Sequence, residues 1–234
     1  EAVQVSESGL TAFKMRIGTE WSWSGVTVDQ FIELLHKVHA AAGDRIDMML
    51  DGNCRLTEEQ ALEIGKALDD MGFYWFEEPI PGDQIEGYER LNDALNTPVT
   101  GGEGLWTVEQ IEPYLENGAY AIVQVDAGVS GLTECIAVGS RAHEAGVPHC
   151  PHSWHNGLMA MCHAHMMAAT PDPKVLELNI RQGPLQWEIF KEKPEIVDGH
   201  LVIPDGLGYG VELADDLEDR FPYIEGSWAD IVER

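Results

Sequence analysis

The sequence contains very little positive charge. Its 234 residues include 14 Lys and Arg but 41 Asp and Glu, which gives a formal net charge of −27 at pH 7. Nucleic-acid binding and attraction to anionic membrane surfaces both depend on clustered Lys and Arg, so the charge balance argues against either partner. Two interpretations of the acidity stay open: an ordinary acidic bacterial protein, which we favour, or adaptation to a saline host.

Long apolar runs, a leader segment and paired cysteines are also missing from the sequence. No stretch approaches the roughly 18 apolar residues that a membrane-spanning helix needs, and residues 1–4 show neither a basic nor an apolar leader region. The four cysteines form no Cys-x-x-Cys pair, which is typical of reduced thiols rather than of a disulfide framework. They are Cys54, Cys135, Cys150 and Cys162. We therefore expect a soluble, cytoplasmic protein.

The sequence does contain an alternation of strand-type and helix-type segments. Hydrophobic residues make up 44% of the chain, which is enough for a core of useful size. Apolar runs predict strands at 12–17, 46–50, 73–76, 99–101, 122–125, 147–150 and 175–176. Amphipathic helical patterns separate them, and one of these begins at a capping box, Thr57-Glu58-Glu59-Gln60. Strands that are apolar on both faces and separated by helices are typical of a parallel α/β sheet.

The chain is expected to form one barrel and a tail. A length of 234 residues favours a single domain, since barrels of roughly 200–250 residues fold as one unit. No linker or break in composition divides residues 1–182, which we predict to be a metal-binding βα barrel. Residues 183–234 are irregular and rich in Pro and Gly, and we predict that this C-terminal tail packs on the barrel.

One ionisable residue follows each of six successive predicted strands. The spacings between them are 26, 26, 23, 26 and 25 residues, about the length of one βα unit; the residues are Asp51, Glu77, Glu103, Asp126, His152 and Glu177. In a closed βα barrel the carboxyl ends of all strands meet at one face, where catalytic groups lie. A single carboxylate at a strand end is usually a helix cap or a loop residue, but six in phase predict an active site.

The first three of these residues are carboxylates, which predicts a metal site. Three negative charges would lie together at the mouth of the barrel, on Asp51, Glu77 and Glu103. Their repulsion would cost several kcal/mol unless a cation neutralises them. All-oxygen ligation by carboxylates points to Mg²⁺. Glu78 lies beside Glu77, and adjacent strand residues point to opposite faces, so only one of the two should face the mouth. The pattern alone does not say which.

The other side of the predicted site carries acid/base and cationic groups. Lys14 and Arg16 are two residues apart on one predicted strand and therefore face the same way. Asp126 and His152 lie at the ends of neighbouring strands, and a carboxylate beside His Nδ1 fixes the tautomer and raises the basicity of the ring. Together with a metal triad, these residues would surround a metal-bound anion with acid/base groups.

The ordered strand-end motifs resemble the mandelate racemase and muconate lactonizing branch of the enolase superfamily. The motifs are Phe-Lys-Met-Arg, Leu-Asp-Gly-Asn, Phe-Glu-Glu-Pro, Gly-Gly-Glu, Gln-Val-Asp-Ala-Gly-Val-Ser-Gly-Leu-Thr-Glu, Pro-His-Ser-Trp and Leu-Glu. The resemblance implies a modified TIM barrel of the (β/α)7β type. It also implies that Asp51, Glu77 and Glu103 bind Mg²⁺, that Asp126 and His152 form a catalytic dyad, and that Glu177 hydrogen-bonds the substrate carboxylate.

Five histidines lie between residues 149 and 165, and the resemblance indicates which of them belongs to the catalytic dyad. The family pattern Pro-His-x-Trp selects His152, in agreement with its 26-residue distance from Asp126. We expect His149 to be a strand residue packed inside the barrel and His155 to contact the substrate. His163 and His165 are two apart on a predicted helix and face apart, so we interpret both as ordinary helix residues.

Two features depart from the family pattern. The second Lys of the usual Lys-x-Lys strand is Arg16 here, and a guanidinium is effectively always protonated. We therefore expect Arg16 to stabilise charge and Lys14 to neutralise the substrate carboxylate. The N-terminal α+β cap and the first barrel strand of the family are not visible in the sequence, and residues 1–10 are interpreted as the end of the helix before the second strand.

The favoured function is a Mg²⁺-dependent dehydratase, a lyase, acting on a small-molecule sugar acid. Members of the branch remove the proton α to a carboxylate, and the acid-sugar dehydratases then expel the β-hydroxyl to leave a 2-keto-3-deoxy acid. A racemase or epimerase is the alternative enzyme, but it needs a base on each face of the carbon, and Arg16 is a poor one. A catalytically silent barrel with an interaction role would not be expected to retain this charged cluster. A homo-oligomer is expected.

Overall fold

A computed structural model describes residues 2–18, 21, 24–43, 46–179 and 183–226 of the chain. The elements of the barrel-forming part are α1 (Ala2–Glu7), β1 (Ala12–Arg16), α2 (Val28–Ala42), β2 (Asp47–Asp51), α3 (Glu58–Met71), β3 (Trp75–Glu77), α4 (Ile85–Ala94), β4 (Val99–Gly101), α5 (Val108–Glu116), β5 (Ile122–Val123), α6 (Ala127–Ser130), α7 (Leu132–Glu144) and α8 (Gly157–Ala169). After them come α9 (Pro184–Trp187), β6 (Ile196–Val197), β7 (His200–Leu201) and α10 (Leu217–Arg220).

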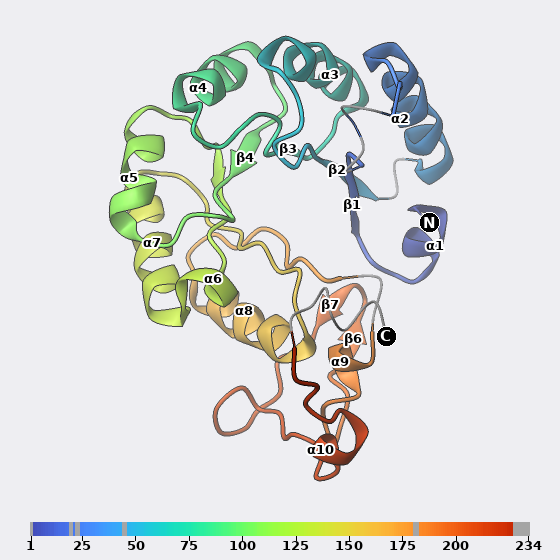
Figure 1. Cartoon of the computed structure of the whole chain (residues 1–234), viewed down its shortest axis with the longest axis vertical. Helices are drawn as coiled ribbons and strands as arrows, with labels where there is room; N and C mark the ends of the chain where they lie inside the picture. The colour runs from blue at the N-terminus through green and yellow to red at the C-terminus, as the bar shows by residue number, and fades with distance from the viewer. Residues whose placement is uncertain (1, 19–20, 22–23, 44–45, 180–182, 227–234) are drawn as a thin grey trace.

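The fold is α/β, with five parallel strands hydrogen-bonded in chain order from β1 to β5. The helices α2, α3, α4, α5, α7 and α8 lie outside the curved sheet as an arc, as in a barrel wall (Figure 1). The strand register places Arg16 opposite Asp51 and Asp51 opposite Glu77. The predicted α/β barrel class is therefore confirmed, and the register already brings three of the predicted site residues to one edge of the sheet.

Two of the predicted strands, at 147–150 and 175–176, do not form. Instead, the part of the chain that is described has a single parallel bridge between Val123 and His149. Val175 and Leu176 line a cavity of about 330 Å³ together with Ala12 and Phe13 of β1. The described residues form no backbone ladder between this segment and β1, and an extended segment without a ladder partner is not a strand.

Side chains alternate between the helices and the barrel interior along each strand. Leu50 of β2 and Phe76 of β3 belong to the large cluster that packs against the helices. Met49 and Trp75, one residue earlier, belong to a separate inner cluster; it also contains Ile122, Cys150 and Met167. Because the period of a strand is two residues, the residues that follow Met49 and Trp75 by two share the inner face. Those residues are Asp51 and Glu77.

The helices begin where the capping chemistry predicts. The Thr57 side chain accepts the backbone N–H of Gln60, and the Gln60 side chain accepts the backbone N–H of Thr57, so the predicted capping box is present. Thr27 and Gln30 form the same box at the start of α2. Each box satisfies backbone donors of the first helical turn and fixes the direction in which the helix leaves its strand.

Residues 183–226 pack on α8. Trp187, Ile189 and Phe190 form a buried cluster with Ala160 and Met161 of α8. The predicted contact between tail and barrel is therefore present in the described residues, whereas the division of the chain at residue 182 stays a prediction. Within the described ranges, no helix has both the length and the apolar character that crossing a membrane requires.

Asp69, near the end of α3, ties this helix to the loop before β4. Its carboxylate accepts the backbone N–H groups of Asn96 (3.0 Å) and Thr97 (2.6 Å). Burial opposes ionisation, but these hydrogen bonds hold the pKa of Asp69 below its ordinary value of 3.8. The carboxylate therefore stabilises the fold in its ionised form.

Asp69→Asn is expected to lower the free energy of unfolding at pH 7 by about 1–2 kcal/mol, because the backbone N–H groups of exposed Asn96 and buried Thr97 lose an ionised acceptor. A depressed folded-state pKa gives stability that is present above the unfolded-state pKa, near 3.8, and lost as the pH falls through the folded-state value. Urea unfolding of parent and variant should therefore differ at pH 7 and converge below about pH 4. Asp70→Asn, at the exposed neighbouring position, is the control and should match the parent at both pH values.

Candidate active site at the carboxyl ends of the strands

Five of the predicted site residues line a common pocket, whereas Glu77, Glu103, Asp126 and His155 are not among its lining residues. A cavity of about 670 Å³ opens at the carboxyl ends of the strands, and its walls include Lys14, Arg16, Asp51, His152, Trp154 and Glu177. Five of these six residues were candidates on sequence grounds. Trp154, from the Pro-His-Ser-Trp motif, was not singled out, although its side chain is half exposed at the pocket.

Glu77, and not Glu78, faces the interior of the barrel. Its Oε1 lies 2.5 Å from the ammonium of Lys14, and its Oε2 accepts hydrogen bonds from Trp75 Nε1 (3.1 Å) and Gln124 Nε2 (2.8 Å). Glu78 has a positive φ of 35° and turns away, with Oε2 3.3 Å from Cys54 Sγ. The strand alternation seen in the inner cluster explains this choice, which the sequence alone left open.

The carboxylates at the mouth carry a surplus of negative charge. Burial, followed by the charge of Glu77, raises the pKa of Asp51 to about 7. Burial also raises the pKa of Glu103. Lys14 is buried, which opposes its charge, but the neighbouring carboxylates more than offset this and raise its pKa. Such a site favours an additional cation.

The chemistry of these donors fits Mg²⁺. Asp51 and Glu77 are almost fully buried register partners on adjacent strands, and Glu103 follows the end of β4. Three carboxylates supply oxygen ligands of the kind that a hard divalent cation prefers. In the structure the oxygen atoms of these three carboxylates do not all lie within 4.8 Å of one another. Among the described Asp, Glu, His and Cys residues, the only group of three that meets this distance is a different one. Lys14 supplies the positive charge beside Glu77.

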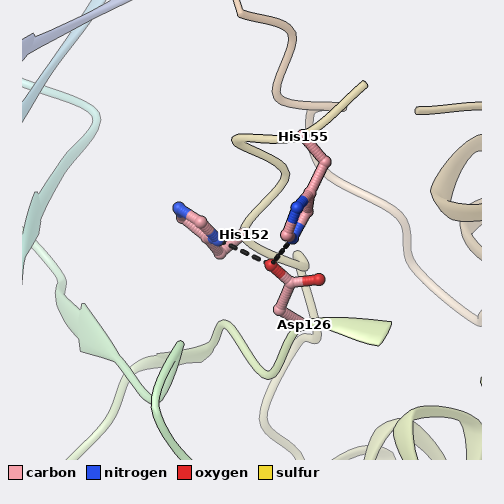
Figure 2. A group of neighbouring side chains, drawn as sticks. All are labelled: Asp126, His152 and His155. Carbon is pink, nitrogen blue, oxygen red and sulfur yellow. Dashed lines mark hydrogen bonds and ion pairs between the residues drawn. The ribbon is translucent and has the colours of Figure 1, made fainter. Parts of the chain in front are cut away.

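The group of three that meets this distance is centred on Asp126, whose side chain is completely buried. Asp126 Oδ2 lies 2.7 Å from His152 Nδ1 and also 2.7 Å from His155 Nε2, so both rings converge on one oxygen (Figure 2). Its Oδ1 accepts the backbone N–H of Gly128 at 2.6 Å, which caps α6. Burial opposes ionisation, but the hydrogen bonds from the histidines hold the pKa of Asp126 far below its usual range.

His152 stands between Asp126 and the predicted metal ligands. Its Nδ1 faces Asp126, and its Nε2 lies 3.4 Å from Glu103 Oε2. Burial opposes its protonation, but the hydrogen bond to Asp126 and the charges of Glu177 and Glu103 raise the pKa of His152 to about 9. The predicted pairing of Asp126 with His152 is therefore present as a short contact, and the ring bridges the two halves of the site.

Glu177 connects the strand ends on the opposite side of the pocket. Its Oε1 lies 2.8 Å from Lys14 Nζ, and its Oε2 accepts the backbone N–H of Ser153 at 2.6 Å. Lys14 is therefore shared by two carboxylates, Glu77 and Glu177. Arg16 Nε lies 3.6 Å from Asp51 Oδ2, and the Arg16 side chain is 51% exposed. Arg16 therefore has weaker ion-pair contacts at the site than Lys14. The expected contact of Lys14 or Glu177 with a substrate carboxylate stays a prediction.

A family model described as enolase C-terminal domain-like matches residues 1–217 of the chain. The chain belongs to this family. An arabinonate dehydratase from Saccharolobus solfataricus is 31% identical over 214 residues, covering 91% of this chain and 56% of the relative. A D-galactarolactone cycloisomerase from Agrobacterium fabrum is 30% identical over 236 residues, covering 94% of this chain and 59% of the relative.

A solved mandelate racemase/muconate lactonizing enzyme from Sulfitobacter sp. has the same fold as this enolase C-terminal domain-like chain. The TM-score is 0.85 at 25% identity, and the match covers 97% of this chain and 58% of that protein. The chain thus spans about half the length of the curated relatives it matches. The resemblance to the mandelate racemase branch of the enolase superfamily is confirmed.

Two histidines of this enolase-like chain lie differently from the prediction. His149 is buried, but it packs outward against α7, with Nε2 2.9 Å from Val125 O and Nδ1 close to the position of a Gly139 Cβ. It therefore does not point into the barrel interior, because strand alternation gives that face to Cys150. Burial lowers the pKa of His149, which is consistent with a neutral packing residue.

His163 is not an ordinary helix residue, and this prediction was wrong. Its ring is completely buried beneath Asp126, with Nε2 3.1 Å from Asp126 Oδ1 and 3.1 Å from the backbone N of Ala127. Its Nδ1 lies 2.9 Å from Ser153 Oγ. His165, on the opposite side of α8, instead has its Nε2 3.0 Å from the carbonyl oxygen of Tyr209. The helical spacing correctly separates the two rings, but it cannot show which one faces the barrel.

His163→Leu is expected to lower the free energy of unfolding by about 2–4 kcal/mol, because the Ala127 N–H and the Ser153 hydroxyl would be buried without their partner. Urea denaturation measures the loss. His165→Leu, on the same helix, is the control and should cost much less. Equal losses for the two variants would contradict the role of His163 in supporting Asp126.

Proposed function

We propose that the protein is a Mg²⁺-dependent dehydratase of a sugar acid, which removes water to give a 2-keto-3-deoxy acid. The observation that supports this most directly is the 2.7 Å contact between Asp126 and His152. The same His152 ring faces Glu103 through Nε2 and lines the pocket together with Lys14 and Arg16. Relatives named as dehydratases of sugar acids support the substrate class.

Asp51, Glu77 and Glu103 are the residues that would hold Mg²⁺. When bound, Mg²⁺ supplies positive charge that makes the α-proton of a carboxylate more acidic and stabilises the enediolate that follows. Lys14 and Arg16 stand beside the same carboxylates and add positive charge at the pocket wall. Arg16 is the more exposed of the two cations and has the planar fork that suits a carboxylate.

His152 is the proposed acid/base group. Asp126 fixes the ring through Nδ1, so that Nε2 is presented to the substrate. In the proposed elimination, the neutral form of His152, which its raised pKa makes the minor form near pH 7, takes the α-proton at Nε2 as the Cα–H bond breaks. The resulting imidazolium returns this proton to the departing β-hydroxyl, which leaves as water when the Cβ–O bond breaks, and the enol product then tautomerises to the keto acid.

Dehydration needs one acid/base group, whereas racemisation needs a competent base on each face of the α-carbon. The position that would carry the second base on the Lys14 strand is Arg16, whose guanidinium gives up a proton too rarely for this role. An isomerase remains the second candidate because one of the relatives is named a cycloisomerase. The chemistry of Arg16 favours the dehydratase.

The two candidates give different products in D₂O. A panel of sugar acids would be incubated with the Mg²⁺-loaded protein, and both keto acids and deuterium incorporation would be measured. The dehydratase is expected to release a keto acid from its substrate. Recovery of α-deuterated, stereo-inverted substrate without any keto acid would instead assign the isomerase reaction.

We further propose that the protein is a cytoplasmic homo-oligomer in which residues 1–182 are the metal-binding barrel and residues 183–234 the tail. The four cysteines are free, as expected in a reducing compartment. The packing of Trp187 and Phe190 on α8 supports the role of the tail. Light scattering of the purified protein measures the oligomeric state, and a monomer would contradict that part of the proposal.

A further inference from the structure

We propose that Asp126, His152 and His155 form a second metal site, which takes a borderline transition metal ion such as Zn²⁺. This site is separate from the all-oxygen group of Asp51, Glu77 and Glu103. Among the described residues, Asp126, His152 and His155 are the group whose potential ligand atoms lie within 4.8 Å of one another.

The two histidine rings already point a nitrogen atom at the same oxygen of Asp126. His152 Nδ1 and His155 Nε2 are each 2.7 Å from Asp126 Oδ2, and Figure 2 shows the two rings approaching this oxygen from different sides. The rings are 79° apart in plane, with centroids separated by 6.0 Å. Two imidazole nitrogens and one carboxylate oxygen at such spacing can bind one ion after small side-chain rotations, with the remaining coordination positions taken by water.

The groups around these ligands resemble the outer shell of a metal site. A metal-bound histidine usually donates its other ring N–H to a carboxylate, and His152 Nε2 lies 3.4 Å from Glu103 Oε2. The free oxygen of Asp126 is oriented by the backbone N–H of Gly128 at 2.6 Å and by the His163 ring at 3.1 Å.

The donor types decide which metal each site prefers. Imidazole nitrogen suits Zn²⁺ and its neighbours in the transition series, while carboxylate and water suit Mg²⁺. Excess Mg²⁺ should therefore leave the Asp126 group free for Zn²⁺. An ion held by His152 Nδ1 would take the place of the proton shared with Asp126 and leave the remaining ring proton on Nε2, so Nε2 could not accept the α-proton. This inhibitory consequence rests on the proposed function, but the binding itself does not.

The test uses Co²⁺ as a coloured substitute for Zn²⁺, in protein saturated with Mg²⁺. Nitrogen and oxygen ligation with four or five ligands gives Co²⁺ visible absorption far stronger than that of a six-coordinate, all-oxygen ion. We expect one equivalent of Co²⁺ to develop strong bands and Zn²⁺ to displace it. In His155→Asn, Zn²⁺ binding should weaken by more than about 100-fold, since loss of even an outer-shell partner costs about 10- to 100-fold.

Gly128→Ala provides a variant that leaves all three ligands in the chain. A Cβ at residue 128 would lie 2.4 Å from His155 Nε2, and the three atoms nearest to it all belong to the His155 ring, so this ring must move away from Asp126. This variant should lose the bands. Gly82→Ala, where a Cβ meets nothing within 4 Å, is its control and should retain them.

Glu77→Gln separates this proposal from the proposed function. The variant alters the predicted Mg²⁺ site but none of the three ligands, so strong Co²⁺ bands should persist in it. Bands that disappear in Glu77→Gln and survive in His155→Asn would overturn the second site and place the Co²⁺ at the carboxylates. Absence of strong bands in the Mg²⁺-saturated parent would show that Asp126, His152 and His155 form a hydrogen-bonded cluster only, and would equally overturn the proposal.

Discussion

His152→Asn is expected to lower kcat on the sugar-acid substrate by about 10²- to 10⁴-fold, the usual contribution of a positioned acid/base group. The Asn amide can still donate a hydrogen bond to Asp126, but it has no counterpart of Nε2, which lies 3.4 Å from Glu103 and borders the pocket. The loss should therefore appear in kcat with little change in KM. The measurement is the rate of keto-acid formation with the substrate found in the panel.

His165→Asn is the control for this substitution. His165 lies on α8 and contacts the carbonyl of Tyr209 rather than Asp126, so its replacement should leave the rate close to that of the parent. A His152→Asn variant that retains the parent kcat would refute the assignment of the acid/base role. A loss of both kcat and folded structure in the control would show that α8 does not tolerate substitution.

Mg²⁺ is expected to raise the unfolding temperature by about 5–10 °C when its concentration is 100 times Kd. Binding to the folded state alone then adds about 2.7 kcal/mol, and each kcal/mol shifts the unfolding temperature of a chain of this size by about 2–4 °C. The physical reason is that burial, followed by the negative charge of Glu77, raises the pKa of Asp51 to about 7. A cation relieves that repulsion directly.

Glu77→Gln should remove most of this stabilisation by Mg²⁺, because it deletes a ligand charge on the inner face of β3. The same variant also loses the partner of Lys14, so the comparison is the difference with and without Mg²⁺ and not the absolute unfolding temperature. Glu112→Gln, which removes a carboxylate paired with Arg141 on the outer helices, is the matched control and should keep the full Mg²⁺ effect. An unchanged unfolding temperature of the parent in millimolar Mg²⁺ would contradict the metal site.

The sequence by itself determined the fold class and predicted which ionisable residues lie at the ends of the βα units. Ionisable residues recur at the ends of successive βα units, and parallel strands bring all their carboxyl ends to one face, so Asp51, Asp126 and Glu177 could be placed together without coordinates. The start of α3 at Thr57 could likewise be predicted, because a capping box is a local pattern of side chains and backbone donors. These features depend on short-range periodicity and on topology, both of which the sequence carries.

Only the tertiary structure decided which neighbouring residue faces the site. Glu77 rather than Glu78 points inward because Met49 and Trp75 set the phase of strand alternation in the inner cluster. His149 faces α7, and His163 instead lies beneath Asp126, although both carry the same side chain. The 175–176 segment has no ladder partner among the described residues, although it lines a cavity together with Ala12 and Phe13 of β1. Facing direction and strand pairing depend on contacts between distant segments, and a local pattern does not contain those contacts.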